Sequence, residues 1–222
     1  MRRQFLVAVG LCGLLAGGCA GRVEGSGTVA RDAAGPSGAA ATSSPPANRS
    51  DRPGTAGRTT LRCSGTVISP AGAPYCFTLP TGFQDTSASA SLGTSSGRGD
   101  KFRSAAALGP RDLIIVTVYE VATDTDGIAD DTLEGELKTV LGRLAQQGLT
   151  FESTTAQRST VDGARSFGYH ARHAKDGFES DIVFLVRGRN EIQVICQWTE
   201  KAAEVRKGCR AVLGSLQFKT VR

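Results

Sequence analysis

Short hydrophobic runs separated by turn residues dominate the sequence after residue 60. The strongest run lies within 111–122, where Leu113 to Val118 is nearly all β-branched or aliphatic, as is typical of a central strand. Gly, Pro and Asp-Gly turns separate the runs. The pattern predicts strands over 61–69, 75–79, 101–108, 111–122, 152–161, 164–174, 178–186 and 191–198.

Two segments have the period of a helix instead. From Asp130 onwards, apolar residues recur at spacings of three and four, and Gly148 follows as a stop signal. We expect Asp130 and Asp131 to cap this helix and to favour its dipole. A second helix is predicted from Glu200. Its apolar positions are Ala203, Val205, Cys209, Val212, Leu213 and Leu216.

The order of these elements favours an α+β fold with helices packed on an antiparallel sheet. Three of the later strands are joined by short turns and predict a meander. Residues 84–100 are rich in Ser, Gly and Asp, and we expect a mobile loop there. The predicted folded domain therefore covers residues 61–222.

The N-terminus has the features of an export signal. Arg2 and Arg3 precede an uncharged apolar stretch, and Leu15-Ala16-Gly17-Gly18-Cys19 resembles a bacterial lipobox. This resemblance implies that residues 1–18 are a lipoprotein signal peptide and that Cys19 carries the lipid, including palmitate. The alternative is an ordinary secretory signal cleaved nearby. Both alternatives place the mature chain outside the cytoplasm.

Residues 19–60 predict a disordered tether behind the lipidated cysteine. Within 20–60, 30 of 41 residues are Gly, Ala, Ser, Thr or Pro, and no aromatic residue, Leu or Ile is present. A flexible coil of this length spans roughly 35 Å. We expect it to hold the domain away from the membrane.

Four cysteines remain after Cys12 and Cys19 are assigned to the signal peptide and the lipid site. An even number outside the cytoplasm indicates disulfides, and four cysteines allow three connectivities. We predict Cys63 with Cys76 and Cys196 with Cys209, because these pairs close short loops that the predicted elements accommodate. A zinc site is disfavoured because CxxC spacing is missing.

The net charge of +5 does not indicate a nucleic-acid partner. Residues 1–18 and 20–60 hold seven of the 26 basic side chains, which leaves 19 basic and 18 acidic side chains in 61–222. A nucleic-acid-binding domain concentrates its positive charge on the folded part. We therefore expect no nucleic-acid partner.

Three stretches resemble the PsbP-like domain of actinobacterial lipoproteins. They are Phe77-Thr78-Leu79-Pro80-Thr81-Gly82-Phe83, the central strand in 111–122, and the ending from Ile192 to Cys196 and from Val212 to Phe218. The resemblance covers about 75–222 and implies an α/β/α sandwich without catalytic function, acting as a binding or accessory module at membranes. The sequence departs from the family at Phe83, where Trp is usual, and in the Cys63 hairpin.

Candidate catalytic groups do not converge in the sequence. His170 and His173 are three residues apart on one strand and therefore point to opposite faces of the sheet. The Gly93 to Gly97 string fits G-x-S-x-G, but it lacks the preceding strand and following helix of a nucleophile elbow. We expect no enzyme, no cofactor and no catalytic residue.

Two other groups of residues are candidate binding sites. Asp124 and Asp126, with Asp130, Asp131, Glu134 and Glu136, offer oxygen ligands for a cation, but their spacing is wrong for an EF-hand. We expect no metal, although the sequence leaves cation binding at Asp124 and Asp126 open. Aromatic residues on the predicted strands are candidates for an apolar ligand pocket. These are Tyr119, Tyr169, Phe184 and Trp198.

Together these features predict a lipid-anchored protein on the extracytoplasmic face of the cell membrane. It would present its domain to a protein, glycolipid or wall partner of the cell envelope. The alternative is a carrier that holds an apolar ligand or lipid between the sheet and a helix.

Overall fold

The computed structural model describes residues 61–90 and 100–219. Its main element is an eight-stranded antiparallel sheet in the order β3-β4-β5-β10-β9-β8-β6, with β7 also paired to β8. The strands are β3 (Gln84–Asp85), β4 (Asp100–Ala107), β5 (Leu113–Glu120), β6 (Leu149–Phe151), β7 (Gln157–Val161), β8 (Ala164–His173), β9 (Phe178–Arg187) and β10 (Asn190–Trp198).

Tight turns set the register of the C-terminal half of this sheet. Asp162 and Gly163, both with positive φ (45° and 74°), join β7 to β8 in a two-residue hairpin. Gly is the residue that adopts such φ values without steric cost. The register of β8 on β9 places His170 opposite Asp181 and Tyr169 opposite Ile182.

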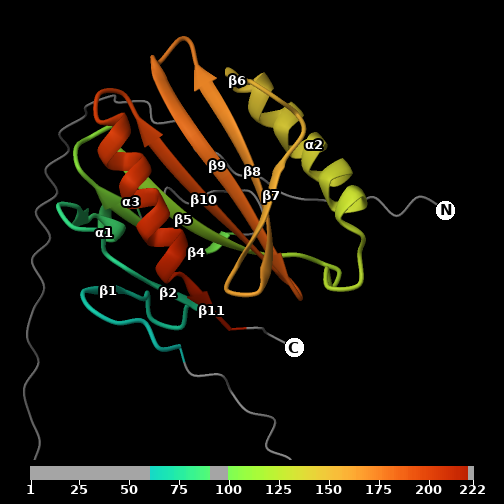
Figure 1. The fold of residues 1–222 in the computed structure, drawn as a ribbon, viewed down its shortest axis with the longest axis horizontal. Coiled ribbons are helices and arrows are strands. Elements are labelled where there is room, and N and C mark those ends of the chain that lie inside the picture. Colours follow the sequence, from blue (N-terminus) through green and yellow to red (C-terminus); the bar gives the residue numbers. More distant parts are fainter. Residues whose placement is uncertain (1–60, 91–99, 220–222) are drawn as a thin grey trace, which may run out of the picture. The chain divides into compact units, whose positions relative to one another are not determined.

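Helices cover the two faces of the sheet (Figure 1). On one face, α2 (Asp130–Gln146) packs its leucines and Val140 against aromatic and aliphatic residues of β8 and β9. On the other face, α3 (Ala202–Ser215) packs Val205, Cys209 and Val212 against β5 and β10. The predicted α+β class and the α/β/α arrangement are therefore confirmed.

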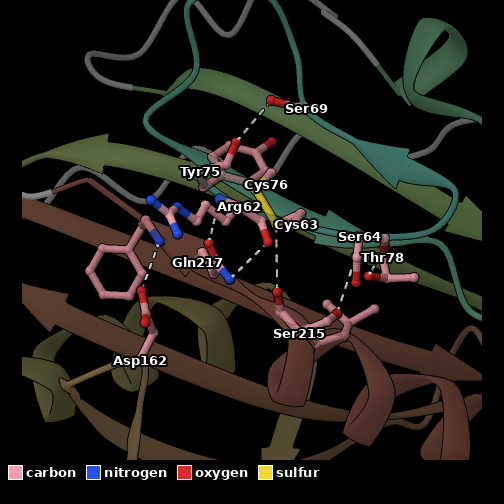
Figure 2. The surroundings of a disulfide bond; sticks show 12 residues. Arg62, Cys63, Ser64, Ser69, Tyr75, Cys76, Thr78, Asp162, Ser215 and Gln217 are labelled. Atoms are coloured by element: carbon pink, nitrogen blue, oxygen red, sulfur yellow. Dashed lines mark hydrogen bonds between the residues drawn. A yellow bond between two sulfur atoms is a disulfide. The ribbon is translucent and has the colours of Figure 1, made fainter. Parts of the chain in front are cut away.

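A small second sheet lies beside the C-terminal end of α3. Its strands β1 (Val67–Ile68), β2 (Tyr75–Thr78) and β11 (Gln217–Phe218) are antiparallel in the order β1-β2-β11. Figure 2 shows how this region holds the start of the domain: Arg62 exchanges hydrogen bonds with the Gln217 side chain, and the Cys63–Cys76 disulfide lies beside the Ser215 carbonyl.

The predicted hairpin of 61–69 and 75–79 is thus present, although its strands are shorter than expected. Three other expectations were wrong in detail. Residues 84–90 form β3 and the short helix α1 (Ser87–Ala90) rather than part of a loop. Of the strand expected over 152–161, only Gln157–Val161 is present, as β7, and the short strand β6 (Leu149–Phe151) precedes the expected range. Residue 129, an alanine, is the N-cap of α2, and no side chain caps that end.

Both predicted disulfides are present in the structure. Cys63 is bonded to Cys76, and Cys196 on β10 is bonded to Cys209 on α3. The second bond fixes α3 to the centre of the sheet. Cys19, the signal peptide, the tether and the Gly93 to Gly97 string lie outside the described residues. Among helices that the structure does describe, none is long and apolar enough to cross a membrane.

Candidate functional site

An open groove of about 680 Å³ runs along α3, over the part of the sheet formed by β8 and β9. We call it the α3 groove. Its floor includes Gly168 and Val183, while Leu213 and the disulfide-bonded Cys209 line it from the helix. The remaining lining residues are Glu152, Gln157, Tyr169, His170, Arg172, Glu179, Asp181, Arg206 and Arg210.

The groove follows from where α3 lies on the sheet. The helix contacts β10, β5 and β2, to which its buried face and the Cys196–Cys209 bond hold it. The neighbouring strand β8 therefore lacks a helical cover on this face. Gly168 deepens the gap because it has no side chain, opposite the half-buried Val183.

His170 is surrounded by carboxylates at one end of the groove. Its Nδ1 lies 2.8 Å from Asp181 Oδ1, and its Nε2 lies 3.6 Å from Glu152 Oε1 and 3.7 Å from Glu179 Oε2. Arg172 contacts both glutamates, at 3.1 and 3.3 Å. Both glutamates at this end of the groove are therefore paired with the Arg172 guanidinium.

The single tryptophan of the chain joins this network to α3. The Trp198 ring stacks on His170 with centroids 5.8 Å apart, and the Arg206 guanidinium lies 4.6 Å from the Trp198 centroid. Arg206 Nε is also 3.6 Å from Asp181. This combination of stacking, cation–π contact and ion pairing fixes the end of the groove nearest the start of α3.

His173 lies on the opposite face of β8, as the spacing predicted. Its Nε2 is 3.0 Å from the Gln147 carbonyl oxygen, its Nδ1 accepts a hydrogen bond from the Asp176 backbone, and its ring stacks on Phe178. These contacts give His173 a structural role at the end of α2. The two histidines do not form a common site.

The four aromatic residues predicted as a ligand pocket do not come together. Tyr169 and Phe184 pack edge to face in the core beneath α2, whereas Trp198 lies on the α3 side of the sheet. Tyr119 donates a hydrogen bond to Gln193 at 3.3 Å. Of the four, only Tyr169 is among the residues that line the α3 groove.

Most of the acidic residues considered for a cation have other partners. Asp130 pairs with Arg165 and Asp131 with Arg158, while Asp126 accepts a hydrogen bond from the Gly188 backbone. Glu134 binds Arg158 at 2.5 Å, and that guanidinium holds the pKa of Glu134 below its usual value. Among the described residues, no group of three or more His, Cys, Asp and Glu side chains is arranged to hold a metal ion.

Two buried acids were not recognised from the sequence. Asp112 precedes β5 and accepts three backbone hydrogen bonds at the start of α3 through one oxygen, from Thr199, Glu200 and Lys201. Glu191 on β10 is 3% exposed, and burial raises its pKa to about 7. Neither acid lines the α3 groove, so we do not assign them to the site.

The structure is similar to a cyanobacterial PsbP. This is the solution structure of CyanoP from Synechocystis sp. PCC 6803, with a TM-score of 0.48 and 15% sequence identity, covering 74% of this chain and 96% of that chain. No protein-family model matches the sequence, and no curated protein matches it. The actinobacterial lipoprotein type remains a prediction from the sequence.

Proposed function

We propose that the chain is a lipid-anchored protein of a bacterial cell envelope whose domain binds a partner and does not catalyse a reaction. The observation that carries this proposal is the α3 groove, an open surface lined by both charged and apolar side chains on a domain held together by two disulfides. The anchor rests on the lipobox at Cys19 and on the composition of residues 20–60.

The lining of the groove favours a protein partner over an apolar cargo. Six of its thirteen lining residues carry a carboxylate or a guanidinium, and Gln157 and His170 add further polar side chains. A site for a lipid tail is normally enclosed and mostly apolar. The carrier alternative also relied on four aromatic residues that lie on different faces of the sheet.

The anchor is tested by metabolic labelling with radioactive palmitate in a bacterium that processes lipoproteins. We expect the full chain to be labelled and to fractionate with membranes, and Cys19→Ala to lose both properties. A Cys12→Ala variant is the matched control, because this cysteine lies inside the predicted signal peptide. Labelling that persists in Cys19→Ala would contradict the anchor.

The carrier alternative is tested by native mass spectrometry of the full chain purified with its disulfides intact. A mass equal to that of the lipidated chain supports partner binding without cargo. A reproducible additional lipid mass that survives removal of the anchor by Cys19→Ala would support the carrier instead.

A further inference from the structure

The two ends of the α3 groove differ in charge balance. At the end that contains His170, Arg172 pairs with Glu152 and Glu179, Arg206 pairs with Asp181, and the His170 ring lies beside the same three carboxylates. One helical turn after Arg206, Arg210 lines the groove, and no carboxylate of the described residues lies within 4.0 Å of it. The groove therefore has one end with internally paired charges and one end with an unneutralised guanidinium.

The surroundings of Arg210 combine polar and apolar groups. Gln157 of β7 lines the groove and pairs in register with Gly168, and Val183 lies opposite Gly168 on β9. Leu213, three residues after Arg210, lies on the same side of α3. We define the open end of the groove by these residues: Gln157, Gly168, Val183, Arg210 and Leu213.

We propose that the open end of the α3 groove binds an acidic segment of a partner protein, in which a carboxylate contacts Arg210 and an adjacent aliphatic side chain covers Val183 and Leu213. This proposal rests on the function proposed above and names the chemistry of the partner.

A carboxylate is the group that suits the open end best. A guanidinium binds a carboxylate through two parallel hydrogen bonds, and this planar geometry is specific as well as strong. The Gln157 amide, which also lines this end, supplies additional hydrogen-bond donors. The paired charges at the other end leave little gain for a cationic ligand, because it would have to displace Arg172 or Arg206 from their carboxylates.

The missing side chain at Gly168 provides the space for the aliphatic group. A Cβ built there would lie 3.5 Å from the Gln157 carbonyl oxygen and 3.8 Å from its Cβ, which is ordinary contact. The strand therefore tolerates a side chain at position 168. A β-branched side chain at this position would extend into the groove and compete with the ligand.

The test uses the full chain and two probe peptides with a neutral fluorescent label. The acidic probe is acetyl-Glu-Leu-Glu-Val-Glu-amide, and the control probe has Lys in place of each Glu. Anisotropy titrations compare the native chain with Arg210→Glu, Gly168→Val and Lys207→Glu. The last variant makes the same charge change on the same helix at an exposed residue outside the groove.

We expect the native chain to prefer the acidic probe. Arg210→Glu should weaken its binding by about fivefold, the upper effect of losing one exposed ion pair, and should reverse the preference towards the Lys probe. Gly168→Val should weaken binding of the acidic probe without changing charge. Lys207→Glu should change the affinity for the acidic probe less than twofold. Circular dichroism should show that all variants are folded.

Two results would overturn the proposal. Equal effects of Arg210→Glu and Lys207→Glu would mean that only net charge matters. Binding to phosphatidylglycerol vesicles that depends on Arg210, with no binding of the acidic probe, would assign the surface to an anionic membrane. Neither result would affect palmitate labelling at Cys19, so the two proposals can fail separately.

Discussion

Replacing Asp112 tests how the sheet holds the helix that forms one wall of the groove. The Asp112 side chain is 6% exposed, and its Oδ1 accepts backbone hydrogen bonds of 3.0, 3.1 and 3.0 Å from Thr199, Glu200 and Lys201. The start of α3 has no capping hydrogen bond from its own N-cap side chain. A residue 87 positions earlier therefore satisfies the backbone donors there.

The expected loss of unfolding free energy follows from the hydrogen-bond donors that each substitution leaves without an acceptor. Asp112→Ala leaves three backbone N–H groups without their acceptor, and loss of a helix cap together with buried donors costs about 3 kcal/mol of unfolding free energy. Asp112→Asn keeps a neutral oxygen and should cost about 1.5 kcal/mol. For a domain of this size, the alanine variant should melt about 6–12 °C lower. Urea unfolding of the full chain, followed by circular dichroism, measures both variants.

The pH dependence of the Asp112 contribution gives a second check. Burial alone would raise the pKa of Asp112, but the three backbone N–H groups and the charge of Lys201 hold it below the ordinary value. The unfolded chain has a pKa of about 3.9 at this residue. The contribution of the Asp112 carboxylate to the unfolding free energy is therefore complete above that pH. It is lost as the pH falls through the lower pKa of the folded chain. The difference in unfolding free energy between the native chain and Asp112→Asn should become smaller below about pH 4.

The reasoning would be refuted by an Asp112→Ala variant as stable as the native chain at pH 7. If Asp112→Asn lowers the unfolding free energy equally at pH 7 and at pH 2.5, the ionised carboxylate is not the source of the stabilisation.

Two further predictions concern packing and charge in the domain. Gly208→Ala should cost about 1–3 kcal/mol of unfolding free energy in urea titrations, because its Cβ would lie 2.6 Å from the Phe83 ring. Gly142→Ala is the matched control, because nothing lies within 4 Å of the Cβ that it would add. It should raise the unfolding free energy by about 0.5–1 kcal/mol. A cost similar to that of Gly208→Ala would contradict the packing argument. Glu191→Gln should stabilise the domain at pH 8, because the raised pKa of Glu191 means that its ionised form destabilises the folded chain. This gain in unfolding free energy should vanish below about pH 4.3, the ordinary pKa of a glutamate. A gain independent of pH would contradict this assignment.

Local patterns in the sequence predicted most of the fold. The period of two in 164–174 and 178–186, with a short turn between them, gives the pairing of β8 with β9 and hence the position of His170 opposite Asp181. The period near 3.6 from Asp130 predicted α2. The two-residue strands β3 and β11 were missed because they are too short to show any period and depend on distant partners.

The α3 groove was not predicted, for a physical reason. The sequence shows that α3 is amphipathic, but only the contacts with β5 and β10 decide which part of the sheet the helix leaves open. The predicted aromatic pocket is not formed, because alternate side chains along a strand point to opposite faces of the sheet. Tyr169 lies opposite Ile182 on one face, whereas Trp198 lies opposite Glu179 on the other.

Site-specific photo-crosslinking in living cells tests the central claim most directly. A photoreactive amino acid replaces Gln157, an exposed residue in the open end of the α3 groove, or Lys138, an exposed residue of α2 that serves as the control. We predict a discrete crosslinked envelope protein from position 157 that is absent from position 138 and is lost with Arg210→Glu. Crosslinks to lipid alone, or the same products from both positions, would contradict the claim that this groove binds a protein partner.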